Sequence, residues 1–159
     1  MYKLDFDIDS YFSYKLIGII TGVPDYQIAH HINKLFDFSL TRTEGHILKT
    51  KKQTSVHDCL KHENDYVNIH LIKNSSNITR KYLSIEKSSV MPDFEDIYGF
   101  KSFYMIPCKK HIDFLLTIDF KFEEIDINLI INKLNKLEFV GLSIHLPMDK
   151  LKHKENLII

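Results

Sequence analysis

Tyr14-Lys-Leu-Ile-Gly-Ile-Ile20 decides the fold of this chain, and Thr21-Gly-Val-Pro-Asp-Tyr26 follows it directly. The first segment is short, almost entirely apolar and rich in β-branched residues, which is typical of a central strand buried on both faces. Pro24 suits the first turn of a helix, because its missing N–H would have no intrahelical partner there. Apolar residues then recur at helical spacing, so the sequence predicts an amphipathic helix over 24–36.

A second amphipathic helix is predicted in the last third of the chain. Its apolar stripe consists of Ile127, Ile130, Ile131, Leu134 and Leu137. Acidic residues precede this stripe and lysines lie near its end, an order that complements the helix dipole.

Outside the helices, apolar and polar residues alternate with a period of two. The clearest alternation covers 67–71, 112–118 and 140–146. This pattern predicts strands with one face on a core and one face toward solvent. Weaker strand patterns cover 2–8, 39–51, 54–61, 79–86 and 101–106.

This order of elements predicts a single α+β domain over residues 1–159. Strand–helix–strand passes at 14–43 and 111–146 flank a run of strands, which favours an antiparallel sheet with both helices packed on one face. The expected core is ferredoxin-like or ACT-like, with an inserted β-meander. A length of 159 residues, of which 44% are hydrophobic, suits one such domain.

The cellular compartment follows from what the sequence lacks. No segment approaches the roughly 20 apolar residues of a membrane helix, and the first ten residues do not resemble a signal peptide. The two cysteines are too few for a disulfide scaffold. We therefore expect a cytoplasmic protein with free thiols and no contact with a membrane.

The charge is balanced overall, with 21 Lys and Arg against 21 Asp and Glu, which argues against a strongly basic nucleic-acid module. Residues 45–90 nevertheless carry an excess of basic groups, with tyrosines among them. Because basic groups and stacking aromatics on a sheet bind single-stranded RNA, an RNA-binding face is one alternative function. Its central residues would be Lys51, Lys52 and Lys81.

The candidate catalytic and metal sites are incomplete. His57, Cys59 and His62 are close in sequence, but a structural zinc site needs four ligands in two tight pairs, and no second pair matches. Cys108 and His111 are a thiol and a nearby base without a third orienting group. The sequence therefore predicts no catalytic residue, no metal and no cofactor.

An acidic and aromatic loop is the best candidate for a binding site. The loop Met91-Pro-Asp-Phe-Glu-Asp-Ile-Tyr-Gly-Phe100 contains the predicted partner-binding residues Phe94, Ile97, Tyr98 and Phe100. Aromatic residues are enriched at the cores of protein interfaces. The leading expectation is therefore a non-catalytic adaptor that contacts an unidentified protein partner.

Two further hypotheses concern the sheet edge and the turn at 21–25. A sheet with open edges can pair with a second copy of itself, so self-association is expected as well. The turn at 21–25 precedes a helix N-terminus, where anions bind. An ACT-like sensor of a small molecule is therefore a second alternative, which rests on fold analogy.

One stretch resembles the signature of a known family. Ile106-Pro-Cys-Lys-Lys-His-Ile-Asp-Phe114 is similar to the I-P-E-x-x-x-V-D-Y sequence for which a family of small bacterial proteins is named. Ile106, Pro107 and Asp113 match this signature, whereas Cys108 stands in the position of its Glu. The segment Asp25-Tyr-Gln-Ile-Ala29, which includes Asp25 and Tyr26, also resembles the family.

The resemblance implies a small cytoplasmic protein but no particular reaction. Because Cys108 replaces the Glu, a structural role for the signature is the better interpretation. Pro107 fits a turn into the following strand, where its missing N–H removes a donor that the sheet does not need. Asp113 is expected to hold that turn by hydrogen bonds.

Overall fold

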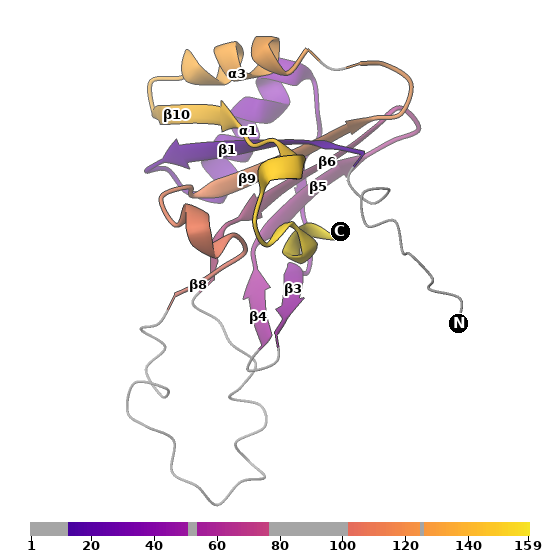
Figure 1. Ribbon diagram of the computed structural model, residues 1–159. Coiled ribbons are helices and arrows are strands. Elements are labelled where there is room, and N and C mark those ends of the chain that lie inside the picture. Colours follow the sequence, from indigo (N-terminus) through magenta and orange to yellow (C-terminus); the bar gives the residue numbers. More distant parts are fainter. Residues whose placement is uncertain (1–12, 51–53, 77–101, 125) are drawn as a thin grey trace, which may run out of the picture.

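The computed structural model describes residues 13–50, 54–76, 102–124 and 126–159 (Figure 1). Its helices and strands are β1 (Lys15–Thr21), α1 (Asp25–Phe36), β2 (Thr41–Arg42), β3 (His46–Lys49), β4 (Thr54–His57), β5 (Cys59–Glu63), β6 (Val67–Lys73), β7 (Ser75–Ser76), β8 (Phe103–Tyr104), β9 (Phe114–Phe120), α3 (Ile127–Asn135) and β10 (Val140–His145). Single 3-10 turns cover Pro107–Lys109, Met148–Lys150 and Lys154–Leu157. The predicted α+β class is confirmed.

Six strands form one sheet in the order β10-β1-β9-β6-β5-β2, and every neighbouring pair is antiparallel. The predicted central strand is β1, which lies between β10 and β9. Leu16, Ile17 and Ile19 of this strand are fully buried, because successive side chains point to opposite faces and both faces are covered at that point. The strand therefore brings a core to each side of the sheet.

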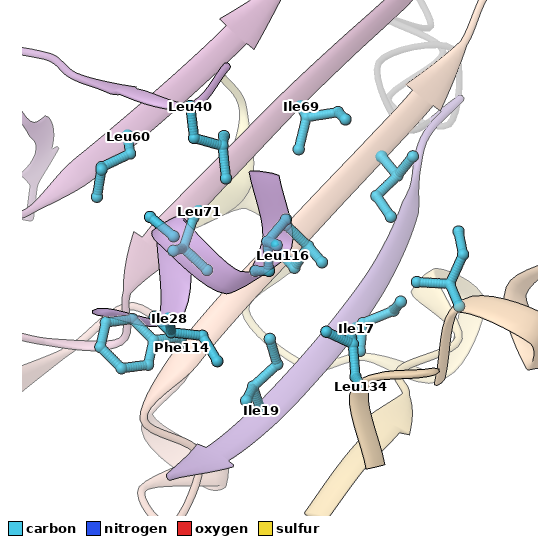
Figure 2. Close-up of a cluster of buried hydrophobic side chains, with 14 of the residues drawn as sticks. Ile17, Ile19, Ile28, Leu40, Leu60, Ile69, Leu71, Phe114, Leu116 and Leu134 are labelled. Atoms are coloured by element: carbon cyan, nitrogen blue, oxygen red, sulfur yellow. The ribbon is translucent and has the colours of Figure 1, made fainter. Parts of the chain in front are cut away.

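The first core lies between the sheet and the two helices. Ile28 and Ile32 of α1 and Ile130 and Leu134 of α3 belong to one buried cluster with Ile17 and other strand residues. Figure 2 shows side chains of this cluster, from both helices and from the strands, gathered on one face of the sheet. The apolar stripes predicted for the helices are therefore the surfaces that they bury.

The ends of the helices are set by local chemistry. Pro24 is the residue before α1 rather than part of its first turn, one position from the prediction, and its carbonyl accepts two backbone N–H bonds of the helix. Asp37 ends α1 in a left-handed conformation, with φ of 56°. The side chain of Asp126 caps α3 by accepting the N–H bonds of Asn128 and Leu129.

At β6 and β9 the second face of the sheet is largely covered, contrary to the prediction of half-buried strands, whereas β10 keeps exposed residues as predicted. Leu16, Ile72 and Leu115 lie in a second buried cluster, under Ile106 and Leu157 from distant parts of the chain. In Figure 1 the C-terminal 3-10 turns lie in front of the sheet, whereas α1 lies behind it. The alternating pattern predicts the exposure of these strand residues wrongly, because residues far away in sequence cover them.

The predicted weaker strands are shorter or divided in the structure. The pattern over 39–51 corresponds to β2 and β3, and that over 54–61 corresponds to β4 and the start of β5. β3 and β4 pair with each other as a separate hairpin, so only part of the expected meander joins the main sheet. The predicted strands at 2–8 and 79–86 lie outside the described residues. Within the described ranges, no helix has the length and apolar character that crossing a membrane requires.

Candidate functional site

A groove lies where α1 ends and α3 begins. Its volume is about 290 Å³, and its lining consists of Phe36, Phe38, Phe120, Glu123, Glu124, Asp126, Leu129, Ile130 and Lys133. We call it the phenylalanine groove. The last residue of α1, the segment after it, the end of β9 and the first turns of α3 each supply part of this lining. The groove therefore exists only because the fold brings two separate stretches of the chain together, 36–38 and 120–133.

Aromatic rings form one wall of the phenylalanine groove. The rings of Phe36 and Phe38 are stacked, with centroids 5.8 Å apart, and the ring of His62 stacks on Phe38 at 5.5 Å. The left-handed residue Asp37 separates the two phenylalanines and ends the helix between them. Lys133 places its ammonium 5.6 Å from the centroid of Phe36, within the range of a cation–π interaction. This wall therefore already accepts one cation.

Acidic groups surround the apolar surface of the groove. Glu123, Glu124 and Asp126 are exposed at its rim, and among its lining residues Lys133 is the single basic one. Leu129 is 53% exposed in the same lining, a high value for a leucine on an amphipathic helix. The groove therefore combines exposed apolar surface with an excess of negative charge.

A pair of exposed aromatic residues lies next to the groove in the chain. Phe122, directly before Glu123, is 77% exposed, and Tyr66 is 68% exposed. Their rings meet edge to face with centroids 6.2 Å apart. The backbone N–H of Lys121 donates to the carbonyl of Tyr66 at 2.9 Å, which holds the β5–β6 turn against the end of β9. Exposed aromatic rings of this kind are enriched at protein interfaces.

The two sets of binding residues predicted from the sequence are not among the described residues. The partner-binding loop residues Phe94, Ile97, Tyr98 and Phe100 and the RNA-binding residues Lys51, Lys52 and Lys81 lie outside the described residues. Part of the groove had a signal in the sequence, namely the acidic residues before the second helix. On the sequence alone, these residues indicate only a complement to the helix dipole.

The signature segment packs against the end of β1. Ile106 is fully buried, and Pro107 opens a 3-10 turn in which Cys108 is exposed. The carboxylate of Asp113 accepts the backbone N–H of Thr21 at 2.9 Å. The backbone N–H of Asp113 donates to the carbonyl of Ile19 at 2.9 Å. Asp113 therefore ties the start of β9 to β1, contrary to the prediction that its side chain holds the turn at Pro107.

Asn74 holds the other side of the signature segment, a role that no sequence pattern indicates. The residue is fully buried. Its amide nitrogen donates to the carbonyls of Lys109 and Ile112, both at 2.9 Å, and its side-chain oxygen accepts the N–H of Ile106 at 3.0 Å. In the sequence Asn74 belongs to a polar cluster that is typical of an exposed turn, so its burial had no local signal.

The turn at 21–25 presents a carboxylate at the N-terminus of α1. Asp25 accepts the backbone N–H of Tyr26 at 2.7 Å and forms an ion pair with Arg42. Tyr26 itself is 67% exposed. Because an acidic side chain lies at this helix end, the turn disfavours an anionic ligand there.

The histidines and the cysteine that suggested a metal do not converge. His57 is fully buried and is hydrogen-bonded to Ser55 and to the carbonyl of Lys73, both at 3.0 Å. Burial lowers the pKa of His57 and raises the pKa of the Cys59 thiol. His62 instead accepts the N–H of Ser39 and stacks on a phenylalanine. In the described part of the chain, no group of three or more His, Cys, Asp or Glu residues is placed to hold a metal ion.

Comparisons of the chain with protein-family models, with curated proteins and with solved structures found no match. The resemblance to the signature family therefore stays a prediction. The phenylalanine groove combines exposed apolar surface with organised charge, which makes it the candidate functional site.

Proposed function

We propose that this protein is a non-catalytic, cytoplasmic domain that binds a protein partner through the phenylalanine groove. The observation that carries the proposal is the mostly apolar lining between α1 and α3, bordered by three carboxylates. This function belongs to the class predicted from the sequence, but the surface is different from the predicted loop.

The partner segment is proposed to carry apolar residues next to Lys or Arg. The apolar residues match Phe36, Phe38 and Leu129, while the basic residues match Glu123 and Glu124. Lys and Arg suit such a site because their aliphatic stems cover apolar surface while their charged ends reach the rim. An amphipathic helix that lies in the groove is the simplest form of such a segment.

The expected affinity is moderate. Full burial of a leucine side chain contributes about 1.5–3 kcal/mol, so covering the exposed half of Leu129 contributes about 1 kcal/mol. Each exposed ion pair at the rim adds about 0.2–1 kcal/mol and is weakened by salt. Because each of these contributions is small, a single groove of this size suits a transient partner whose binding weakens as the salt concentration rises.

The test uses a labelled amphipathic peptide of Leu and Lys and a matched peptide with Glu in place of every Lys. Fluorescence anisotropy should show saturable binding of the Lys peptide and no saturable binding of the Glu peptide. The double variant Glu123→Lys with Glu124→Lys should weaken that binding at least tenfold. Glu138→Lys is the matched control, because Glu138 is exposed beyond the other end of α3. Equal affinity of the wild type and the double variant would contradict the proposal.

We also propose that β1, α1, β6, β9, α3 and β10 form a ferredoxin-like core. The support is the strand order β10-β1-β9-β6 together with the helix that connects β9 to β10 across β1. In this interpretation β5 and β2 extend the sheet at one edge.

β10 is the edge strand on the other side of the sheet. Two copies of the chain that pair along β10 would appear as a dimer in light scattering.

A further inference from the structure

A small polar pocket lies on the face of the sheet opposite the helices. Its volume is about 100 Å³, several times the space that one water needs. Its lining consists of Ser13, Tyr14, Asn68, His70, Thr117, Asp119 and Ile159. The phenylalanine groove shares none of these residues, so the two sites are independent.

The strand register explains why the polar residues meet. Asn68 of β6 lies directly opposite Asp119 of β9, and His70 lies directly opposite Thr117. These two pairs are two residues apart along each strand, so all four side chains point to the same face. Side chains in directly opposite positions of an antiparallel pair are close enough to interact. The pocket therefore has a floor of two adjacent cross-strand polar pairs.

One acceptor in this pocket lacks a donor. The side-chain oxygen of Asn68 is buried, and within the described chain it has no hydrogen-bond partner. The neighbouring groups do have partners, since Ser13 donates to Asp119 at 3.2 Å and Thr117 lies 3.4 Å from His70 Nδ1. Buried polar atoms in folded proteins are almost always hydrogen-bonded. The Asn68 oxygen therefore marks a position where the N–H or O–H of a ligand fits.

The charge of the lining favours a cationic ligand. Asp119 has the single side-chain carboxylate among the lining residues, and the lining contains no Lys or Arg. Burial lowers the pKa of His70 to about 4, so this ring is neutral at pH 7 and can accept a hydrogen bond. Burial also raises the pKa of Tyr14, so its phenol stays uncharged. The side chains of the lining thus carry one negative charge and several hydrogen-bond acceptors.

We propose that this pocket binds the primary ammonium group of a small amine, with Asn68 Oδ1 and Asp119 as its acceptors. An ammonium group has three N–H donors and no acceptor, which matches a site with an unsatisfied oxygen beside a carboxylate. The volume limits the ligand to a few non-hydrogen atoms inside the pocket. The ligand class is therefore a small aliphatic amine.

The test follows side-chain resonances of His70 and Asn68 by NMR during titration with methylammonium chloride. Tetramethylammonium chloride and sodium formate, at the same ionic strength, are the comparison ligands. Methylammonium should give saturable shifts, because it alone offers N–H donors. Tetramethylammonium has the same charge without a donor, and formate tests an anion, so neither should saturate.

Two variants separate binding from folding. Asp119→Asn should weaken methylammonium binding at least tenfold, whereas Asp65→Asn, an exposed control outside the pocket, should leave it unchanged. Asn68→Leu removes the acceptor at similar volume and should abolish binding without lowering the melting temperature. Saturation by formate, an equal response to tetramethylammonium, no saturation at all, or full binding by Asp119→Asn would each overturn the proposal.

Discussion

Replacement of Asn74 by Ala should destabilise the domain far more than the same replacement of a surface asparagine does. The side chain of Asn74 makes three hydrogen bonds, to the carbonyls of Lys109 and Ile112 and from the N–H of Ile106. Alanine keeps the backbone bonds of residue 74 but leaves these three groups without that partner. The carbonyl of Lys109 keeps the N–H of Ile112 as a donor, but the other two groups are buried and lose their partner. Each such loss costs about 1–3 kcal/mol, so the expected destabilisation is about 3 kcal/mol.

The assay is urea unfolding followed by circular dichroism. For a domain of this size, with an m value of about 2 kcal/mol/M, a loss of 3 kcal/mol lowers the unfolding midpoint by about 1.5 M. Asn128→Ala is the matched control, because Asn128 is exposed on α3 and its loss should change stability by less than about 0.5 kcal/mol. A midpoint for Asn74→Ala within about 0.3 M of the wild type would refute the role given to this residue.

The variant Asn74→Asp adds a pH signature to the same reasoning. It keeps the oxygen that accepts from Ile106 but turns a carboxylate toward the two carbonyls that Asn74 now serves. The pKa of this new carboxyl should be raised in the folded state, since only its protonated form can donate to a carbonyl. Relative to wild type at each pH, the stability deficit should therefore shrink as the pH falls from 7 to 5. A deficit that does not change over this range would contradict the geometry.

Three further predictions concern other parts of the fold. Burial lowers the pKa of His70 to about 4 from an ordinary 6.5, so the unfolded state binds more protons between these pH values. The melting temperature should therefore fall as the pH drops from 6.5 to 4, and this decline should be shallower in His70→Gln. Gly18→Ala should lower the free energy of unfolding, measured by chemical denaturation, by about 1–3 kcal/mol, because the new Cβ would lie 2.6 Å from a buried side-chain carbon. Gly22→Ala should leave it unchanged, because a Cβ there meets nothing within 4 Å. The exposed thiol of Cys108 should react with a disulfide reagent in the native protein, while Cys59 should react only after unfolding, because burial raises its pKa and blocks access.

The elements with a strong local pattern could be predicted from the sequence. The β1 segment and the apolar stripes of α1 and α3 were found because each pattern lies within a single element. The α+β class followed from the order of these elements along the chain. The cover of the second sheet face could not be found in this way, because Leu157 and Ile106 are far in sequence from the strand residues that they bury.

The candidate sites could not be predicted from the sequence as well as these elements. Phe36, Phe120 and Leu129 each lie on a different element, and nothing local indicates that they line one groove. The polar floor of the amine pocket depends on the pairing of β6 with β9, whose register the sequence does not specify. Asn74 shows the same difficulty, since it lies in a turn-like polar cluster and is nevertheless fully buried.

The most direct test of the proposed function is amide NMR mapping of the wild-type protein during titration with the Leu and Lys peptide. The account predicts shift changes concentrated at the end of α1, at 120–124 and in the first turns of α3, with none around the turn at 21–25. The same spectrum of the Glu123→Lys with Glu124→Lys variant should stay unchanged at the same peptide concentration. Shifts that concentrate on another face, or that persist in the variant, would contradict binding through the phenylalanine groove.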